Sequence, residues 1–187
     1  MRKISAAINM TLDGYCDHTA ITPGEEIHHH YAELLKNADA ILYGRITYQL
    51  MQFWQTLVEK PSGEQSMDEF ALAIDKVPKI VFSRTMQNTE WHSARLSKQT
   101  IKEEVLSLKH SGNSGSKDIY VGSRSIMIQL LNLGLVDECQ ICVHPVIAGG
   151  GLPLFENISG RIGLRLTGTK TFGEGAVLFY YEPANKT

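Results

Sequence analysis

The chain has 187 residues, of which 43% are hydrophobic and 20% charged, with a formal net charge of −2. A domain of this size buries enough surface to fold without a metal ion or a disulfide. The balanced charge argues against a nucleic-acid-binding protein, which usually carries a basic face. No apolar stretch approaches the roughly 18 residues of a membrane span. The apolar segment from Ile4 is interrupted at Asn9, so we interpret it as the first strand of a cytoplasmic protein rather than a signal peptide.

Apolar runs alternate with helical stretches along most of the chain, which predicts an α/β fold. The expected strands cover residues 3–9, 40–43, 79–83, 89–92, 118–121, 138–147, 163–171 and 176–182. The expected helices cover residues 25–36, 46–55, 67–75, 98–110 and 125–133. A glycine-rich turn at 172–176 joins the last two strands into an antiparallel hairpin. We therefore predict one domain over residues 1–187, with a central mixed, mostly parallel sheet of about eight strands and helices on both faces.

Two clusters of potential metal ligands are interpreted as structural. Cys139 and Cys142 have a C-x-x-C spacing, but they fall in a predicted strand, where residues three apart point to opposite faces. His28, His29 and His30 fall in a predicted helix, where neighbouring side chains diverge by about 100°. We expect no metal site.

Three predicted strands end on the same combination of a small residue, an arginine and a hydroxyl. The three sets are Gly44, Arg45 and Thr47; Ser83, Arg84 and Thr85; and Gly122, Ser123, Arg124 and Ser125. Ligands of open α/β sheets bind at the carboxyl ends of the strands, and a helix that begins there offers N–H groups to a phosphate. Each set alone would also serve as an ordinary strand-to-helix turn with a helix cap. Together they predict a ligand with several phosphates.

Four further segments carry recognisable motifs. They are MTLDG at 10–14, DAILYGRITY at 39–48, LNLGLVDE at 131–138 and PVIAGGGLPLF at 145–155. These segments resemble the reductase domain of the bifunctional riboflavin-biosynthesis deaminase-reductase, a branch of the dihydrofolate reductase superfamily. The resemblance implies a dihydrofolate reductase-like fold, NADPH as the cofactor and a homodimer. Long, largely apolar strands at 138–147 and 163–182, which we expect at a sheet edge, favour the same oligomer.

The resemblance also implies roles for individual residues. The cofactor residues would be Gly44, Arg45 and Thr47 at phosphates, Ser83 and Arg84 at the 2′-phosphate, Gly122, Ser123, Arg124 and Ser125 at the pyrophosphate, and Ala6, Ala7 and Gly14 beside the nicotinamide. We expect Asp13 and His28 to be the catalytic side chains and Asn9 and Tyr15 to contact the substrate. Asp13 could also be a turn residue, because Asp-Gly is a common turn pair. Tyr15 and Trp54 could equally be aromatic residues of the core or of the rim of the site.

The function we expect is that of an NADPH-dependent reductase acting on a small molecule, similar to 5-amino-6-(5-phosphoribosylamino)uracil reductase. Hydride would pass to a C=N or C=O carbon of a small, heterocyclic or ribosylated substrate. Ala7 or a neighbour stands where the riboflavin enzymes have a lysine, and His28 falls near the position of the pterin-binding carboxylate of dihydrofolate reductases. Two alternatives therefore stay open, a dihydrofolate reductase and a nucleotide-binding module without catalysis.

Overall fold

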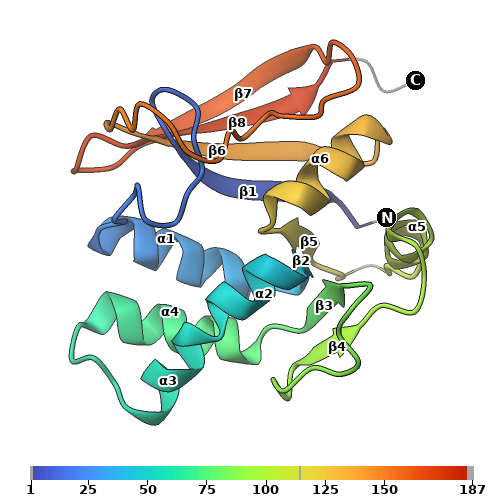
Figure 1. Cartoon of the computed structure of the whole chain (residues 1–187), viewed down its shortest axis with the longest axis horizontal. Coiled ribbons are helices and arrows are strands. Elements are labelled where there is room, and N and C mark those ends of the chain that lie inside the picture. Colours follow the sequence, from blue (N-terminus) through green and yellow to red (C-terminus); the bar gives the residue numbers. More distant parts are fainter. Residues whose placement is uncertain (1, 114, 185–187) are drawn as a thin grey trace.

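Within residues 2–113 and 115–184, which the computed structural model describes, eight strands form one sheet in the order β4-β3-β2-β5-β1-β6-β8-β7 (Figure 1). The strands are β1 (Ile4–Thr11), β2 (Ala38–Gly44), β3 (Lys79–Phe82), β4 (Ala94–Leu96), β5 (Asp118–Val121), β6 (Glu138–His144), β7 (Leu164–Thr171) and β8 (Val177–Pro183). The first six strands are parallel, and β8 and β7 continue the sheet antiparallel. The predicted α/β sheet with a C-terminal antiparallel hairpin is confirmed.

Helices cover both faces of this sheet. They are α1 (Glu25–Lys36), α2 (Arg45–Met51), α3 (Phe53–Glu59), α4 (Gln65–Lys76), α5 (Ile101–His110) and α6 (Arg124–Asn132). Strand residues alternate between the faces, so Leu42 packs with α5 and α6 while Ile41 and Tyr43 pack with α1 and α4. No helix of the described ranges combines the length and apolarity needed to cross a membrane.

Several predicted boundaries were wrong, and in the first two cases a tertiary contact decides the local structure. The predicted strand 89–92 is a loop, since Trp91 is drawn into the core and its backbone N–H donates to the Tyr48 hydroxyl; the strand lies at Ala94–Leu96 instead. The predicted helix 46–55 is two helices, because buried Tyr48 anchors α2 while Trp54 anchors α3 on α4.

The third boundary concerns β6, which ends at His144 rather than at 147, because Pro145 has no N–H to continue the ladder. The predicted position of this strand at a sheet edge was also wrong. β6 lies inside the sheet between β1 and β8, and β7 is the edge strand.

The two spaced cysteines lie in different parts of the core. Cys139 packs in the cluster beneath α5 and α6, whereas Cys142 packs with Ile27 of α1. Burial raises the pKa of Cys139 to about 11 and that of Cys142 to about 12, so both thiols stay protonated at neutral pH. The prediction that they point to opposite faces is confirmed.

His30 is the histidine of α1 that turns into the core. Its ring lies 5.3 Å from that of Tyr31 and 5.6 Å from that of Phe172, and its Nε2 is buried without a hydrogen-bond partner among the described residues. Burial, reinforced by the nearby charge of Lys170, lowers the pKa of His30 to about 4.

This burial predicts an acid-sensitive fold. Between pH 6.5 and 4 the unfolded chain binds a proton at His30 more readily than the folded chain does, so the free energy of unfolding should fall as the pH falls through this range. His30→Phe should remove on the order of 1–2 kcal/mol of that decline. Urea unfolding at several pH values measures it, with His110→Phe at the exposed end of α5 as the control. Parallel pH profiles for His30→Phe and the wild type would refute the explanation.

Candidate functional site

The carboxyl ends of β2, β3, β4 and β5 border a cavity of about 680 Å³, which we call the polar cavity. Helices α2 and α6 begin at its rim, so the sheet, two helix starts and the loops after β3 and β4 form its walls. The structure brings together seven of the predicted cofactor residues here. They are Gly44, Arg45, Thr47, Ser83, Arg84, Ser123 and Ser125.

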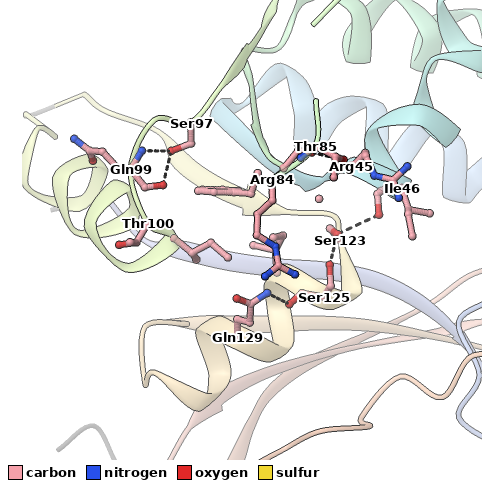
Figure 2. A pocket seen from close by; sticks show the side chains of 16 residues that line it. Arg45, Ile46, Arg84, Thr85, Ser97, Gln99, Thr100, Ser123, Ser125 and Gln129 are labelled. Carbon is pink, nitrogen blue, oxygen red and sulfur yellow. Dashed lines mark hydrogen bonds between the residues drawn. The ribbon is translucent and has the colours of Figure 1, made fainter. Parts of the chain in front are cut away.

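Two arginines enter the polar cavity from different elements. Arg45 opens α2, and its Nη1 donates to Gln49 Oε1 at 3.1 Å. Arg84 follows β3 and has no hydrogen-bond or ion-pair partner among the described residues; Figure 2 shows its side chain extending into the cavity. Since neither arginine is paired with a carboxylate in the described part of the chain, both charges are available to an anion.

Hydroxyl groups cluster between the starts of α2 and α6. Thr47 Oγ1 donates to Ser123 Oγ at 3.1 Å, and the Ser123 and Ser125 hydroxyls lie 3.4 Å apart (Figure 2). Ser123 is the N-cap of α6, but its side chain makes no capping hydrogen bond, which leaves backbone N–H groups of the first turn available to a ligand.

Gly44 allows this cluster to form at the end of β2. A Cβ atom at Gly44 would lie 3.0 Å from Ser125 Oγ and 3.3 Å from Ser123 Oγ. The glycine therefore keeps the end of the strand in contact with the hydroxyl groups.

One wall of the polar cavity was missed in the sequence. The loop between β4 and α5 contributes Ser97, Gln99 and Thr100. Thr100 and Glu103 form a capping box at the start of α5. This Thr-x-x-Glu pattern marks a helix start at Ile101, three residues after the predicted start at residue 98.

A second cavity of about 550 Å³, which we call the aromatic cavity, adjoins the first; Ile46 and Thr47 line both. Its walls come from the end of β1, from α1, α2, α3 and α4, and from the segment after β1. The Trp54 and Phe70 rings meet edge to face with centroids 4.5 Å apart. The cavity is thus lined by aromatic side chains from different helices, whose proximity cannot be predicted from their spacing in the sequence.

Asn9 is the hydrogen-bonding side chain at the sheet end of the aromatic cavity. Its Oδ1 accepts a hydrogen bond from Tyr31 Oη at 3.1 Å and contacts His144 Nε2 at the same distance. Burial raises the pKa of Tyr31 well above its ordinary value and lowers the pKa of His144, so both partners are neutral at pH 7. Asn9, the predicted substrate contact, thus lines the aromatic cavity.

His28, a predicted catalytic residue, also lines the aromatic cavity. Its ring packs edge to face on Trp54 with centroids 5.7 Å apart. Burial lowers the pKa of His28, although the Glu174 and Glu64 carboxylates oppose this shift. The imidazole of His28 is therefore neutral at any pH above its ordinary pKa.

Asp13, the other predicted catalytic residue, lies outside the linings of both cavities. Its carboxylate accepts hydrogen bonds from Thr11 Oγ1 at 2.6 Å, Ala148 N at 3.1 Å and Gly149 N at 2.7 Å. The Thr11 hydroxyl, followed by these backbone groups, lowers the pKa of Asp13 to about 2. A carboxylate held in this way carries no proton to donate, and it ties the 145–151 loop to the end of β1.

Arg124 differs from the other two arginines. Its Nε donates to the Pro153 carbonyl at 2.5 Å and its Nη2 pairs with Glu156 at 2.7 Å. It lines the aromatic rather than the polar cavity, so the predicted pyrophosphate contact does not fit this arrangement. Gly122 also lines the aromatic cavity, and a Cβ there would lie 2.9 Å from the Tyr43 ring, which gives this glycine a packing role.

The remaining predicted residues border neither cavity. Ala6 is 0% exposed within the core, and Ala7 packs with the cluster on the α1 side. Gly14 has a φ of 90° in the turn after β1 and hydrogen-bonds Leu154 through its carbonyl. Tyr15 forms an isolated bridge with Pro153. The turn after β1 therefore supports the 145–154 loop.

The fold and the two cavities together define an α/β domain whose ligand site lies at the carboxyl ends of parallel strands, with an anion-binding part and an aromatic part. The model of the RibD C-terminal domain family matches residues 2–178. The chain belongs to this family.

Two curated relatives come from Bacillus subtilis strain 168. The uncharacterized protein YyaP is 38% identical over 152 residues, which cover 81% of this chain and 77% of YyaP. The uncharacterized protein YwjB is 25% identical over 150 residues, which cover 80% of this chain and 77% of YwjB.

Solved structures share the fold. A putative riboflavin biosynthesis protein from Shewanella sp. PV-4 superposes with a TM-score of 0.71 at 19% identity, covering 99% of this chain and 100% of that one. The diaminohydroxyphosphoribosylaminopyrimidine deaminase/5-amino-6-(5-phosphoribosylamino)uracil reductase of Thermotoga maritima superposes with a TM-score of 0.65 at 16% identity, covering 98% of this chain and 57% of that one. The predicted resemblance to the riboflavin-biosynthesis reductase domain is confirmed at the level of family and fold.

Proposed function

We propose that the chain is an NADPH-dependent reductase that reduces a C=N or C=O bond of a small heterocyclic substrate. The observation that carries the proposal is the polar cavity, where Arg45 and Arg84 have no carboxylate partner among the described residues and face a cluster of hydroxyl groups. Membership of the RibD C-terminal domain family and the reductase activity named for the Thermotoga relative support it.

The polar cavity has the donors that a phosphorylated dinucleotide requires. Arg84 and Ser83 would hold the 2′-phosphate, and Arg45, Thr47, Ser123 and Ser125 the diphosphate. The bound NADPH would supply hydride for the substrate carbon. The substrate nitrogen or oxygen would gain a proton from water, and NADP⁺ would be left.

The chain's own residues would position the substrate and limit the access of water. The Trp54 and Phe70 rings would cover a planar ring, and the Asn9 amide would orient it at the end of β1. His28 is retained as a candidate substrate contact and hydrogen-bond donor, because it lines the aromatic cavity. Asp13 is not retained as a proton donor.

The test is a titration with NADPH and NADH followed by NADPH oxidation with a panel of ribosylaminopyrimidines, pterins and aldehydes. We expect NADPH to bind more tightly and at least one ribosylaminopyrimidine to be reduced. Oxidation with dihydrofolate alone would instead establish the dihydrofolate reductase alternative, and tight binding without any oxidation would establish the nucleotide-binding module. Absence of NADPH binding would contradict the proposal.

We also propose a homodimer that forms along the edge strand β7. This strand offers an unpaired backbone edge and exposes Leu164 and Leu166, which are 40% and 51% accessible. Light scattering at micromolar concentration should give a mass near twice 20.8 kDa. Leu166→Lys should shift it to the monomer, whereas Leu12→Lys, at another exposed leucine, should not. A monomeric wild type would refute the proposal.

A further inference from the structure

The aromatic cavity has no cation left to bind a phosphate. Of the described residues that line it, Arg124 is the one lysine or arginine. Its Nε donates to the Pro153 carbonyl and its Nη2 pairs with the Glu156 carboxylate, so its positive charge is already balanced. A phosphate in this cavity would have to compete with Glu156 for that charge, and a buried charge without a counter-charge is costly.

A cavity that adjoins the aromatic cavity is lined by acidic side chains. It has a volume of about 630 Å³, shares Trp54 and His28 with the aromatic cavity and is lined by Glu25 and Glu64, without any lysine or arginine among its described lining residues. Glu174, from the turn between β7 and β8, lies so close that a side chain at Gly24 would overlap its carboxylate.

These carboxylates have few counter-charges. Glu64 and Glu174 have no ion-pair partner among the described residues, and Glu25 pairs only with the imidazole of His29, at 3.5 Å. Both Glu64 and Glu174 act electrostatically on His28, which lines the aromatic cavity. A phosphate dianion on this side of the cavity would therefore be repelled.

Asn9 offers a hydrogen-bond donor inside the aromatic cavity. The two contacts of Asn9 Oδ1, with Tyr31 and His144, fix the orientation of the amide. Its Nδ2 has no partner among the described residues, so it remains available to donate to a ligand. A carbonyl oxygen or an unprotonated ring nitrogen is the complementary acceptor, and the edge-to-face pair of Trp54 and Phe70 suits a flat ring.

From these observations we infer that the substrate is a planar, uncharged heterocycle without a phosphate group, recognised through a carbonyl or ring nitrogen by Asn9. The inference rests on the proposed reductase function and names the substrate class of the same site. It distinguishes this chain from the Thermotoga enzyme, whose named substrate is phosphoribosylated.

The experiment compares two compounds that differ only in the phosphate, 5-amino-6-ribosylaminouracil and its 5′-phosphate, by calorimetric titration with and without saturating NADPH. We expect the compound without phosphate to bind at least about tenfold more tightly, because the phosphate meets acidic side chains and no free cation. Glu64→Gln should narrow this ratio by improving the affinity of the phosphorylated compound. Tighter binding of the phosphorylated compound, or binding of neither compound, would overturn the inference.

Two variants test the recognition itself. Asn9→Ala should weaken binding of the neutral compound by about tenfold, in line with the loss of a buried hydrogen bond, whereas Asn88→Ala, at an exposed asparagine outside the cavity linings, should leave it unchanged. Full affinity in Asn9→Ala would overturn the assigned contact. NADPH titration of the wild type reports on the phosphate contacts of the polar cavity, which the two uracil compounds do not use. A chain that binds the neutral compound but not NADPH would therefore refute the reductase proposal and leave the substrate class standing.

Discussion

Arg84→Ala should lower the affinity for NADPH about tenfold or more and abolish the preference for NADPH over NADH. A charge-assisted hydrogen bond to a phosphate contributes roughly 1.5–3 kcal/mol, and the loss of this free energy lowers affinity about tenfold or more. Arg84 has no partner among the described residues, so its removal breaks no interaction within the protein and the melting temperature should stay unchanged. Cofactor titrations at one salt concentration, with a melting curve for each protein, measure both effects.

The matched control for Arg84→Ala is Arg165→Ala on β7, which removes an arginine paired with Glu182 on the hairpin. Its effect on both cofactors should be negligible. Equal affinity of the wild type for NADPH and NADH would contradict the assignment of Arg84 to the 2′-phosphate.

Gly44→Ala should reduce NADPH affinity more than it reduces stability. The added methyl group would lie 3.0 Å from Ser125 Oγ and 3.3 Å from Ser123 Oγ, so it displaces hydroxyls that would bind the diphosphate. Crowding of this degree costs about 1 kcal/mol of stability, while the loss of two phosphate contacts lowers affinity by about tenfold or more.

Two further variants separate the effects of Gly44→Ala. Gly44→Ala with Ser125→Ala relieves the closest contact, so stability should return while affinity stays low. Gly160→Ala is the control, because a Cβ there meets nothing within 4 Å. Equal losses of stability and affinity in Gly44→Ala, or unchanged affinity, would mean that the turn is structural only.

The parts of the site that the sequence predicted are those encoded by neighbouring residues. The segments around Arg45 and Arg84 combine a strand end, a small residue and a hydroxyl within a few positions, and parallel strands bring such ends to one edge. The same pattern around Arg124 was misleading, because Pro153 and Glu156 of a distant loop occupy its guanidinium. Local sequence does not reveal a partner about thirty positions away.

The aromatic cavity could not be predicted from spacing. Tyr31, Trp54 and Phe70 come from three different helices and meet only because α1, α3 and α4 pack together. The wall that contains Thr100 was missed because residues 98–100 were assigned to the helix, which begins at Ile101. The strand predicted at 89–92 was wrong because the Trp91 ring is buried and its backbone N–H donates to the Tyr48 hydroxyl. Tertiary packing overrode β propensity at that position.

The measurement that tests the central claim most directly is a crystal structure of the chain with NADPH. We predict the 2′-phosphate within hydrogen-bonding distance of Arg84, the diphosphate beside Ser123 and Ser125, and the nicotinamide entering the aromatic cavity near Asn9. NADPH bound elsewhere, or a polar cavity that stays without cofactor in crystals grown at saturating NADPH, would contradict the account.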